Sequence, residues 1–150
     1  VTRRGAMCDQ GVDLMSLYPT LCELAGVPVP KHAEGVSIKP LLANPAAEWA
    51  QPGLSTMYQN NHTLRTADWR YIRYEDGSEE LYNERTDPQE WTNLAGKPQY
   101  ADVKKKLAKY LPARNAADSG YGPPAGWRAA GWWQRRNCVR RGSDRGVSAL

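Results

Sequence analysis

Residues 60–94 read NNHTLRTADWRYIRYEDGSEELYNERTDPQEWTNL, and they carry the densest strand and turn signals in the chain. Successive side chains of the segment 69–74, WRYIRY, point to opposite faces, which is the period of a β-strand. Residues 75–78, EDGS, put glycine where a tight reversal needs a positive φ, and residues 79–83, EELYN, supply a return strand. This stretch therefore predicts a β-hairpin.

A second local signal follows the hairpin at residues 87–90, DPQE. Asp can cap a helix, Pro suits the first helical position, and Glu three residues after the cap can complete a capping box. The sequence predicts one short helical turn here, with Trp91 and Leu94 on its apolar side and Trp91 in the core together with Trp69. The two carboxylates also resemble an acid–base pair, but capping explains both of them.

Two more strands and a first helix are expected before the hairpin. Residues 54–58 and 62–65 bring the sheet to about four strands. A helix over residues 16–26 follows from leucines spaced by three and four, with Ser16 as its N-cap and Gly26 as its stop.

Two further helices are expected, over residues 36–42 and 100–111. The second of them is amphipathic, with apolar residues on one side and a lysine-rich outer face. That outer face is expected to hold Lys104, Lys105, Lys106 and Lys109.

The composition fits one soluble domain of modest size. The 150 residues are 41% hydrophobic and 24% charged. No run approaches the about 18 consecutive apolar residues of a membrane helix. Residues 1–6, VTRRGA, hold neither an initiator Met nor the hydrophobic run of a signal peptide, which suggests a piece of a longer chain.

Residues 113–150 differ in composition from the rest. They hold seven Arg, no Lys and two Asp, whereas residues 1–112 hold seven Lys and six Arg against fourteen acidic residues. An irregular, flexible tail is one interpretation, and a shifted reading frame or a fusion is another origin for such a segment. Cys8, Cys22 and Cys138 are widely spaced and odd in number, so we expect free thiols rather than disulfides or zinc ligands.

Several strings, taken together, resemble sulfatases. Residues 8–10, CDQ, 17–26, LYPTLCELAG, and 35–42, GVSIKPLL, look like the end of the sulfatase main domain. Residues 65–72 and 80–94 look like the C-terminal subdomain of the same family. The resemblance covers about residues 1–112 and is strongest to the iduronate sulfatase-like and choline sulfatase-like branch.

The resemblance implies an α/β parent fold of the alkaline phosphatase-like kind. This chain would be an α+β fragment of it, with a small antiparallel sheet of about four strands, flanking helices and an irregular tail. The family hydrolyses sulfuric esters with a formylglycine nucleophile and a calcium ion. No cysteine here begins the required Cys-x-Pro/Ala-x-Arg motif, and no Asp-Asp or Asp-Asn pair occurs. We therefore expect no catalytic residue, metal ligand or cofactor in this chain, whereas calcium and formylglycine are expected in the full-length protein, which would be periplasmic or secreted.

The resemblance also implies that the chain consists of three segments with different roles. Residues 1–53 would end the main domain, 54–112 would form the C-terminal subdomain, and 113–150 would be the basic tail. The missing N-terminal catalytic domain would be the partner, and a sulfated small molecule or sugar the substrate. Since loops of the small subdomain can border the substrate cleft in this family, Asn61, His62 and Arg65 are the candidate substrate contacts, with an ordinary turn before a strand as the alternative.

Two other functions stay open at this point. A nucleic-acid-binding module would use the tail's arginines for phosphates and its tryptophans for stacking on bases. The residues concerned are Arg135, Arg136, Arg140, Arg141, Arg145, Trp132 and Trp133. A partner-binding module would use exposed tryptophans.

Overall fold

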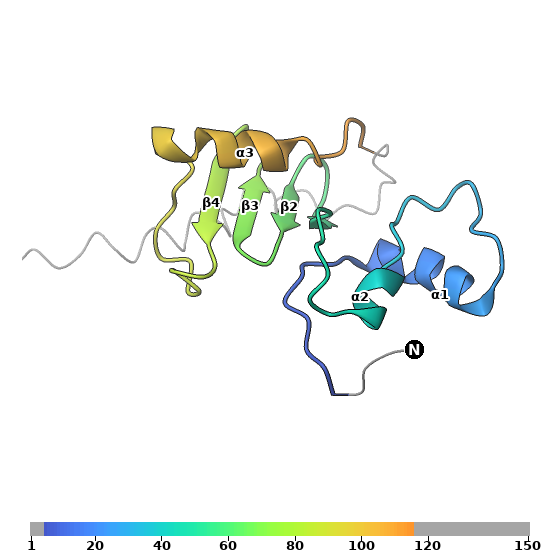
Figure 1. The fold of residues 1–150 in the computed structure, drawn as a ribbon. Helices are drawn as coiled ribbons and strands as arrows, with labels where there is room; N and C mark the ends of the chain where they lie inside the picture. Colours follow the sequence, from blue (N-terminus) through green and yellow to red (C-terminus); the bar gives the residue numbers. More distant parts are fainter. Residues whose placement is uncertain (1–4, 116–150) are drawn as a thin grey trace, which may run out of the picture. The chain divides into compact units, whose positions relative to one another are not determined.

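The structure is a computed structural model, and it describes residues 5–115. These residues belong to one compact unit, Val1–Ala116. No helix in the described range is long and apolar enough to cross a membrane. Figure 1 shows the order of the elements. Their bounds are η1 Leu14–Ser16, α1 Leu17–Ala25, α2 Lys39–Ala43, β1 Gly53–Thr56, β2 His62–Arg65, β3 Trp69–Arg73, β4 Glu79–Asn83, η2 Pro98–Tyr100 and α3 Ala101–Ala108, where η marks a 3-10 helix.

The four strands form one antiparallel sheet in the order β1-β2-β3-β4, so each strand pairs with its neighbour in sequence. The predicted hairpin is confirmed, because β3 and β4 pair from Trp69 opposite Asn83 to Arg73 opposite Glu79. Gly77 takes a φ of 81° in the reversal. The Asp-Gly signal and the alternation around it therefore located this hairpin correctly.

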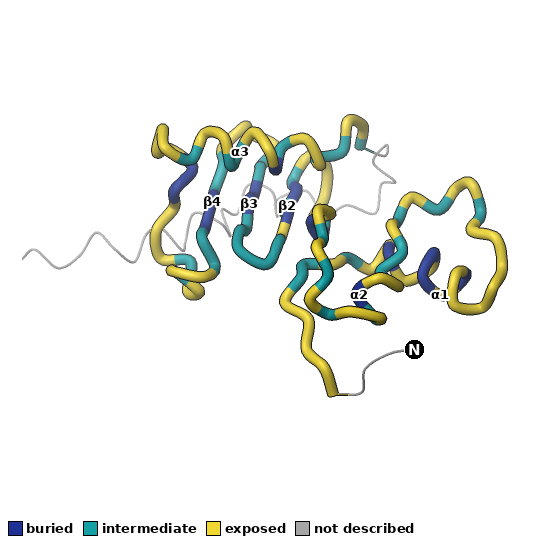
Figure 2. The backbone as a smooth tube through the Cα atoms, in the orientation of Figure 1, coloured by how far each residue is buried: buried dark blue, intermediate teal, exposed yellow. Residues whose placement is uncertain are grey.

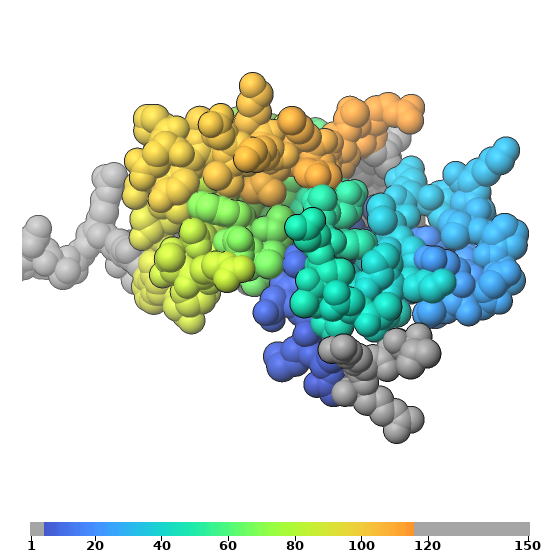
Figure 3. All heavy atoms as spheres, viewed as in Figure 1, coloured from blue at the N-terminus to red at the C-terminus, as the bar shows by residue number. Residues whose placement is uncertain are grey.

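One face of the sheet is covered by α3, and the core lies between them. Leu64, Tyr71 and Leu81, from the three adjacent strands, are at most 1% exposed and cluster with Leu107 of α3. Figure 2 shows the buried stretches in the middle of β2, β3 and β4, and Figure 3 shows the atoms of α3 against those of the strands. Since burying a side chain of leucine size contributes about 1.5–3 kcal/mol, this layer stabilises the sheet more than any surface contact does.

Lys104 contradicts the expected solvent face of α3. Its Nζ lies 2.8 Å from Glu79 Oε2 of β4, whereas Lys105, Lys106 and Lys109 are exposed as predicted. The position borders the apolar stripe of the helix, so a long side chain there can reach the sheet edge. Sequence spacing alone did not reveal the carboxylate that it meets.

The first helix is confirmed with Ser16 at its N-cap position, but the side-chain cap comes from Asp13, which precedes η1. Asp13 Oδ1 accepts hydrogen bonds from the Ser16 backbone N–H at 3.0 Å and from the Ser16 hydroxyl at 2.8 Å. A turn of 3-10 helix therefore precedes α1, and the Ser16 side chain makes no capping bond. Gly26 ends α1 as predicted, with a φ of 70° and its N–H directed to the Cys22 and Glu23 carbonyls.

The leucine stripe of η1 and α1 faces solvent in the described part of the chain. Its members are Leu14, Leu17, Leu21 and Leu24, which are 83%, 48%, 63% and 52% exposed. The buried residues of α1 are Pro19, Thr20 and Cys22 instead. Thr20 Oγ1 accepts a hydrogen bond from the Ile38 N–H at 2.9 Å, which joins α1 to the start of α2.

The predicted helical turn after the hairpin is wrong. Asp87 does cap backbone N–H groups, those of Trp91 at 3.0 Å and Thr92 at 2.7 Å, but no helix follows. Glu90 takes a φ of 55° and its side chain pairs with Arg70 at 2.7 Å rather than completing a capping box. Trp91 is 64% exposed and lies outside the core, contrary to expectation, whereas Leu94 is buried.

Candidate functional site

The candidate contacts lie where β1 turns into β2. Residues 57–61 form the turn, which is closed by a 2.9 Å hydrogen bond from the Met57 N–H to the Asn61 carbonyl. The Asn61 amide donates to the Gln59 carbonyl at 2.8 Å and accepts from the Glu75 N–H at 3.2 Å. The Asn61 side chain therefore stabilises its own turn and joins it by a hydrogen bond to the neighbouring β3–β4 turn.

His62 begins β2 and is 1% exposed. Its Nδ1 lies 3.0 Å from the hydroxyl of Thr56, its cross-strand partner, and its buried Nε2 completes no hydrogen bond within the described residues. Burial, followed by the positive charge of Arg73, lowers the pKa of the ring, while the side chain of Asn115 acts in the opposite direction. A neutral imidazole at neutral pH offers one unused nitrogen as a hydrogen-bonding atom.

Arg65 lies apart from His62, although only three residues separate them. The β2 side chains alternate, so His62 and Leu64 are buried on one face while Arg65 is exposed on the other. The Arg65 guanidinium pairs with Glu84 Oε2 at 3.1 Å. The structure thus brings Asn61 and His62 together and leaves Arg65 outside that group.

The sequence did not indicate that Arg73 and Asn115 would act on His62. Arg73 is the β3 residue directly opposite His62, and knowing the strand register would have revealed it. Asn115 follows α3, and its side chain reaches the β1–β2 turn at Asn60. No local pattern signals such a contact, because it depends on where α3 ends.

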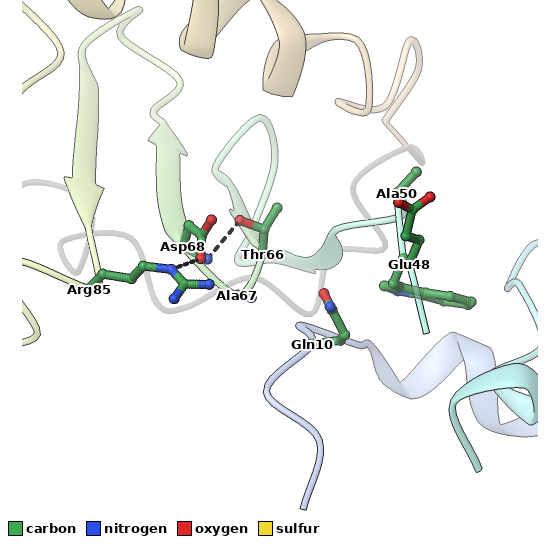
Figure 4. A pocket seen from close by; sticks show the side chains of 8 residues that line it. Gln10, Glu48, Ala50, Thr66, Ala67, Asp68 and Arg85 are labelled. Carbon is green, nitrogen blue, oxygen red and sulfur yellow. Dashed lines mark hydrogen bonds and ion pairs between the residues drawn. The ribbon is translucent and has the colours of Figure 1, made fainter. Parts of the chain in front are cut away.

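A shallow hollow of about 440 Å³ lies elsewhere on the same unit (Figure 4). The polar residues and the aromatic residue that line it are Gln10, Glu48, Trp49, Thr66, Asp68 and Arg85. Arg85 is paired with Asp68, as the dashed line in Figure 4 marks, so the cation in the lining is already neutralised. The Trp49 indole N–H is buried and completes no hydrogen bond within the described residues. Among its lining residues, therefore, no cation is left unpaired to bind a sulfate.

The described residues do not fit a calcium ion or a formylglycine. No group of three or more His, Cys, Asp or Glu side chains in residues 5–115 is arranged to hold a metal ion. Within that range Cys8 is exposed and Cys22 is buried, and the strings that they begin are Cys-Asp-Gln and Cys-Glu-Leu. We therefore derive no chemical step through either group in this chain.

Comparison with protein families identifies the chain. The model for the family "N-sulphoglucosamine sulphohydrolase, C-terminal" matches residues 2–117. The chain belongs to the sulfatases. It corresponds to their C-terminal part, and its α+β arrangement with four antiparallel strands agrees with the fragment that the sequence predicted.

Known sulfatases are similar to this sulfatase chain over most of its length. A sulfatase of Formosa agariphila is 34% identical over 121 residues, which are 79% of this chain and 24% of the relative. An N-acetylglucosamine-6-O-sulfatase of Bacteroides thetaiotaomicron is 34% identical over 106 residues, or 62% of this chain and 19% of the relative. The solved structure of BT4656 in complex with its substrate D-glucosamine-2-N,6-O-disulfate has 31% identity and a TM-score of 0.49, covering 62% of this chain and 22% of that one.

The chain spans about a quarter or less of the length of these curated relatives. The family match ends at residue 117, close to the point where the composition changes. The arginines and tryptophans of the nucleic-acid hypothesis, and Cys138, lie outside the described residues.

Proposed function

We propose that this chain supplies the small subdomain that packs beside the active site of a sulfuric ester hydrolase and that it is inactive alone. The match to the C-terminal sulfatase family over residues 2–117 carries the proposal. In this proposal residues 1–53 end the main domain and residues 54–112 form the subdomain. The catalytic part of the same protein is the partner, with an α/β alkaline phosphatase-like fold and the calcium and formylglycine of the family.

The exposed leucine stripe of η1 and α1 supports a partner of this kind. Leu14 and Leu21 are 83% and 63% exposed, and contiguous apolar surface of this sort marks an interaction site. Because the relatives are several times longer than this chain, the catalytic part has ample surface to cover the stripe. The charged outer face of α3 is the part of the fold best suited to remain in water.

The substrate proposed for the whole protein is a sulfated sugar, as in the relative named for N-acetylglucosamine 6-sulfate. Asn61 and His62 are the substrate contacts that this chain would contribute. Asn61 is partly exposed in the turn and can meet a ligand directly, whereas the buried His62 would take part only if the turn opened to expose its unpartnered Nε2. Arg65 would take part only if Glu84 released its guanidinium.

A turnover assay tests whether the chain is inactive alone. The full chain should release no 4-nitrophenol from 4-nitrophenyl sulfate, with or without calcium, because its described residues hold neither a metal site nor a formylglycine motif. Calcium-dependent hydrolysis above the buffer rate would overturn the proposal.

A binding measurement tests the contacts. N-acetylglucosamine 6-sulfate should shift the amide resonances of residues 57–62 in the ¹⁵N-labelled full chain, and unsulfated N-acetylglucosamine should shift them less. Equal shifts from both sugars, or none from either, would remove Asn61 and His62 from the substrate site.

A further inference from the structure

The β1–β2 turn has a backbone that must be held in place. Tyr58 and Asn60 have φ values of 58° and 61°, in the left-handed region that L-residues rarely adopt. Asn tolerates this conformation, whereas a tyrosine pays a cost of about 1–3 kcal/mol when its backbone is forced into a sparsely populated region. Tyr58 is also 52% exposed, so burial of its ring does not compensate for that cost. Other contacts must keep the turn in this shape.

Two attachments from outside the turn supply those contacts. One is the hydrogen bond from the Glu75 N–H to Asn61 Oδ1, at 3.2 Å. The other comes from Asn115, whose Nδ2 donates to Asn60 Oδ1 at 2.5 Å and whose Oδ1 accepts from the Asn60 N–H at 3.4 Å. Asn115 thus contacts Asn60 through both of its polar atoms, across 55 positions of sequence.

Asn115 is held in position by the core. It follows α3, whose Leu107 is 7% exposed within the hydrophobic cluster, and Leu111 packs against the same cluster. The chain stays turned after the helix, because the Leu111 N–H donates to the Ala108 carbonyl at 3.2 Å. The packing of α3 on the sheet therefore directs the chain that leads to Asn115.

The Asn115 side chain also acts on the imidazole of His62, where it opposes the lowering of the ring's pKa. The groups that act on that ring come from three elements, namely Thr56 of β1 at Nδ1, Arg73 of β3 through its charge, and Asn115 after α3. Nε2 is the ring atom left without a completed hydrogen bond in the described chain. The Asn115 side chain that holds Asn60 therefore also influences the protonation of the neighbouring ring.

From these contacts we propose that Asn115 is a positioning residue, which holds the β1–β2 turn next to His62 in its left-handed shape. The inference rests on the proposed function for its biological meaning, since the turn and His62 are the contacts suggested for a sulfated sugar. Asn115 itself touches the turn and not the substrate. Its geometry makes the site preorganised before any ligand arrives.

NMR of the full chain tests the clamp without any ligand. The chain has only two histidines, so the ring resonances of His62 and of the exposed His32 are easily separated. In Asn115→Ala, we expect amide hydrogen exchange at Asn60 to rise about 5- to 10-fold, which corresponds to the loss of about one hydrogen bond. The pKa of His62 should fall further, because the side chain that opposes its lowering is gone.

Two further variants separate positioning from general stability. Asn115→Asp keeps an acceptor for the Asn60 N–H and adds a negative charge, so Asn60 should stay protected while the pKa of His62 rises. Arg114→Ala removes the adjacent exposed side chain and should change neither quantity. Opposite shifts of His62 in the two Asn115 variants would not arise from a purely structural role, and Asn115→Asp carries the test if Asn115→Ala fails to fold.

Unchanged exchange at Asn60 in Asn115→Ala, or an unchanged titration of His62 in both Asn115 variants, would overturn the clamp. A different result would overturn the proposed substrate contacts alone. If the clamp behaves as expected but N-acetylglucosamine 6-sulfate shifts no resonance of residues 57–62, the positioning role stands and the substrate assignment falls.

Discussion

Glu79 is the residue that joins the sheet to α3 electrostatically. It accepts a hydrogen bond from the Tyr71 hydroxyl on the neighbouring strand and pairs with Lys104 of α3 at 2.8 Å. Lys104 and then Tyr71 lower the pKa of Glu79, while burial and the nearby carboxylate raise the pKa of Tyr71. The ionised form of Glu79 is thus the form that the folded chain stabilises.

The pH dependence of folding should follow from Glu79. A carboxyl group whose pKa is lowered in the folded state adds stability above its unfolded pKa, and this stability is lost as the pH falls through the folded pKa. Glu79→Gln should cost about 1–3 kcal/mol at pH 7 and should flatten the acid side of the stability curve. Urea unfolding between pH 3 and 8 measures both effects.

The matched control for this variant is Glu75→Gln, which changes an exposed carboxylate in the neighbouring hairpin turn. It should leave the curve nearly unchanged. Acid limbs of equal steepness in wild type and Glu79→Gln would show that the ion pair is not coupled to folding.

At the residue scale, the sequence indicated which loop holds the candidate residues but not which side chains they contact. It placed Asn61 and His62 together in a loop before a strand, and the structure keeps them together. It did not anticipate that His62 would be buried or that Asn115, which follows α3, would contact Asn60. Local propensity says nothing about a contact between residues so far apart.

At the scale of elements, the attachment of the segment before α1 to the sheet depends on a glycine. A Cβ on Gly11 would lie 2.2 Å from the Arg65 carbonyl oxygen at the end of β2. Nearby, the Leu54 N–H of β1 donates to Asp13 Oδ2 at 3.3 Å. The chain thus passes the sheet edge at a distance that only glycine allows.

Gly11→Ala should therefore destabilise the chain. The backbone must shift to relieve the contact with Arg65, and we expect a cost of about 1–3 kcal/mol in urea unfolding. Gly96→Ala is the control, since a Cβ there meets no atom within 4 Å, and it should be neutral or slightly stabilising. Equal stabilities of the two variants would show that residues near Gly11 can move without cost.

The elements themselves were predictable to different degrees. The β3–β4 hairpin depends on an Asp-Gly turn between alternating strands, which are local signals, and it was predicted correctly. The turn at residues 87–90 carries helix-start residues but forms no helix, because Arg70 on β3 binds the Glu90 side chain that the capping box would need. Tertiary contacts overrode propensity there.

At the scale of the whole molecule, the distribution of apolar surface is the informative feature. The apolar face of α3 and the centre of the sheet bury each other, whereas the leucines of α1 are exposed in the described chain. Helical periodicity predicted α1 correctly but carries no information about which surface covers its apolar side. In the function proposed above, the covering surface belongs to the catalytic part of the sulfatase, which this chain does not include.

The exposed stripe should make the isolated chain associate with itself. Replacing Leu21 and Leu24, which are 63% and 52% exposed, with Gln should raise the monomer fraction in sedimentation velocity while changing the free energy of unfolding by only about 0.5 kcal/mol. The buried Leu107→Ala should behave in the opposite way, costing about 2–5 kcal/mol without reducing association. An unchanged monomer fraction in the double Gln variant would show that the stripe does not drive contacts between copies, and its role as a partner surface would then lose this support.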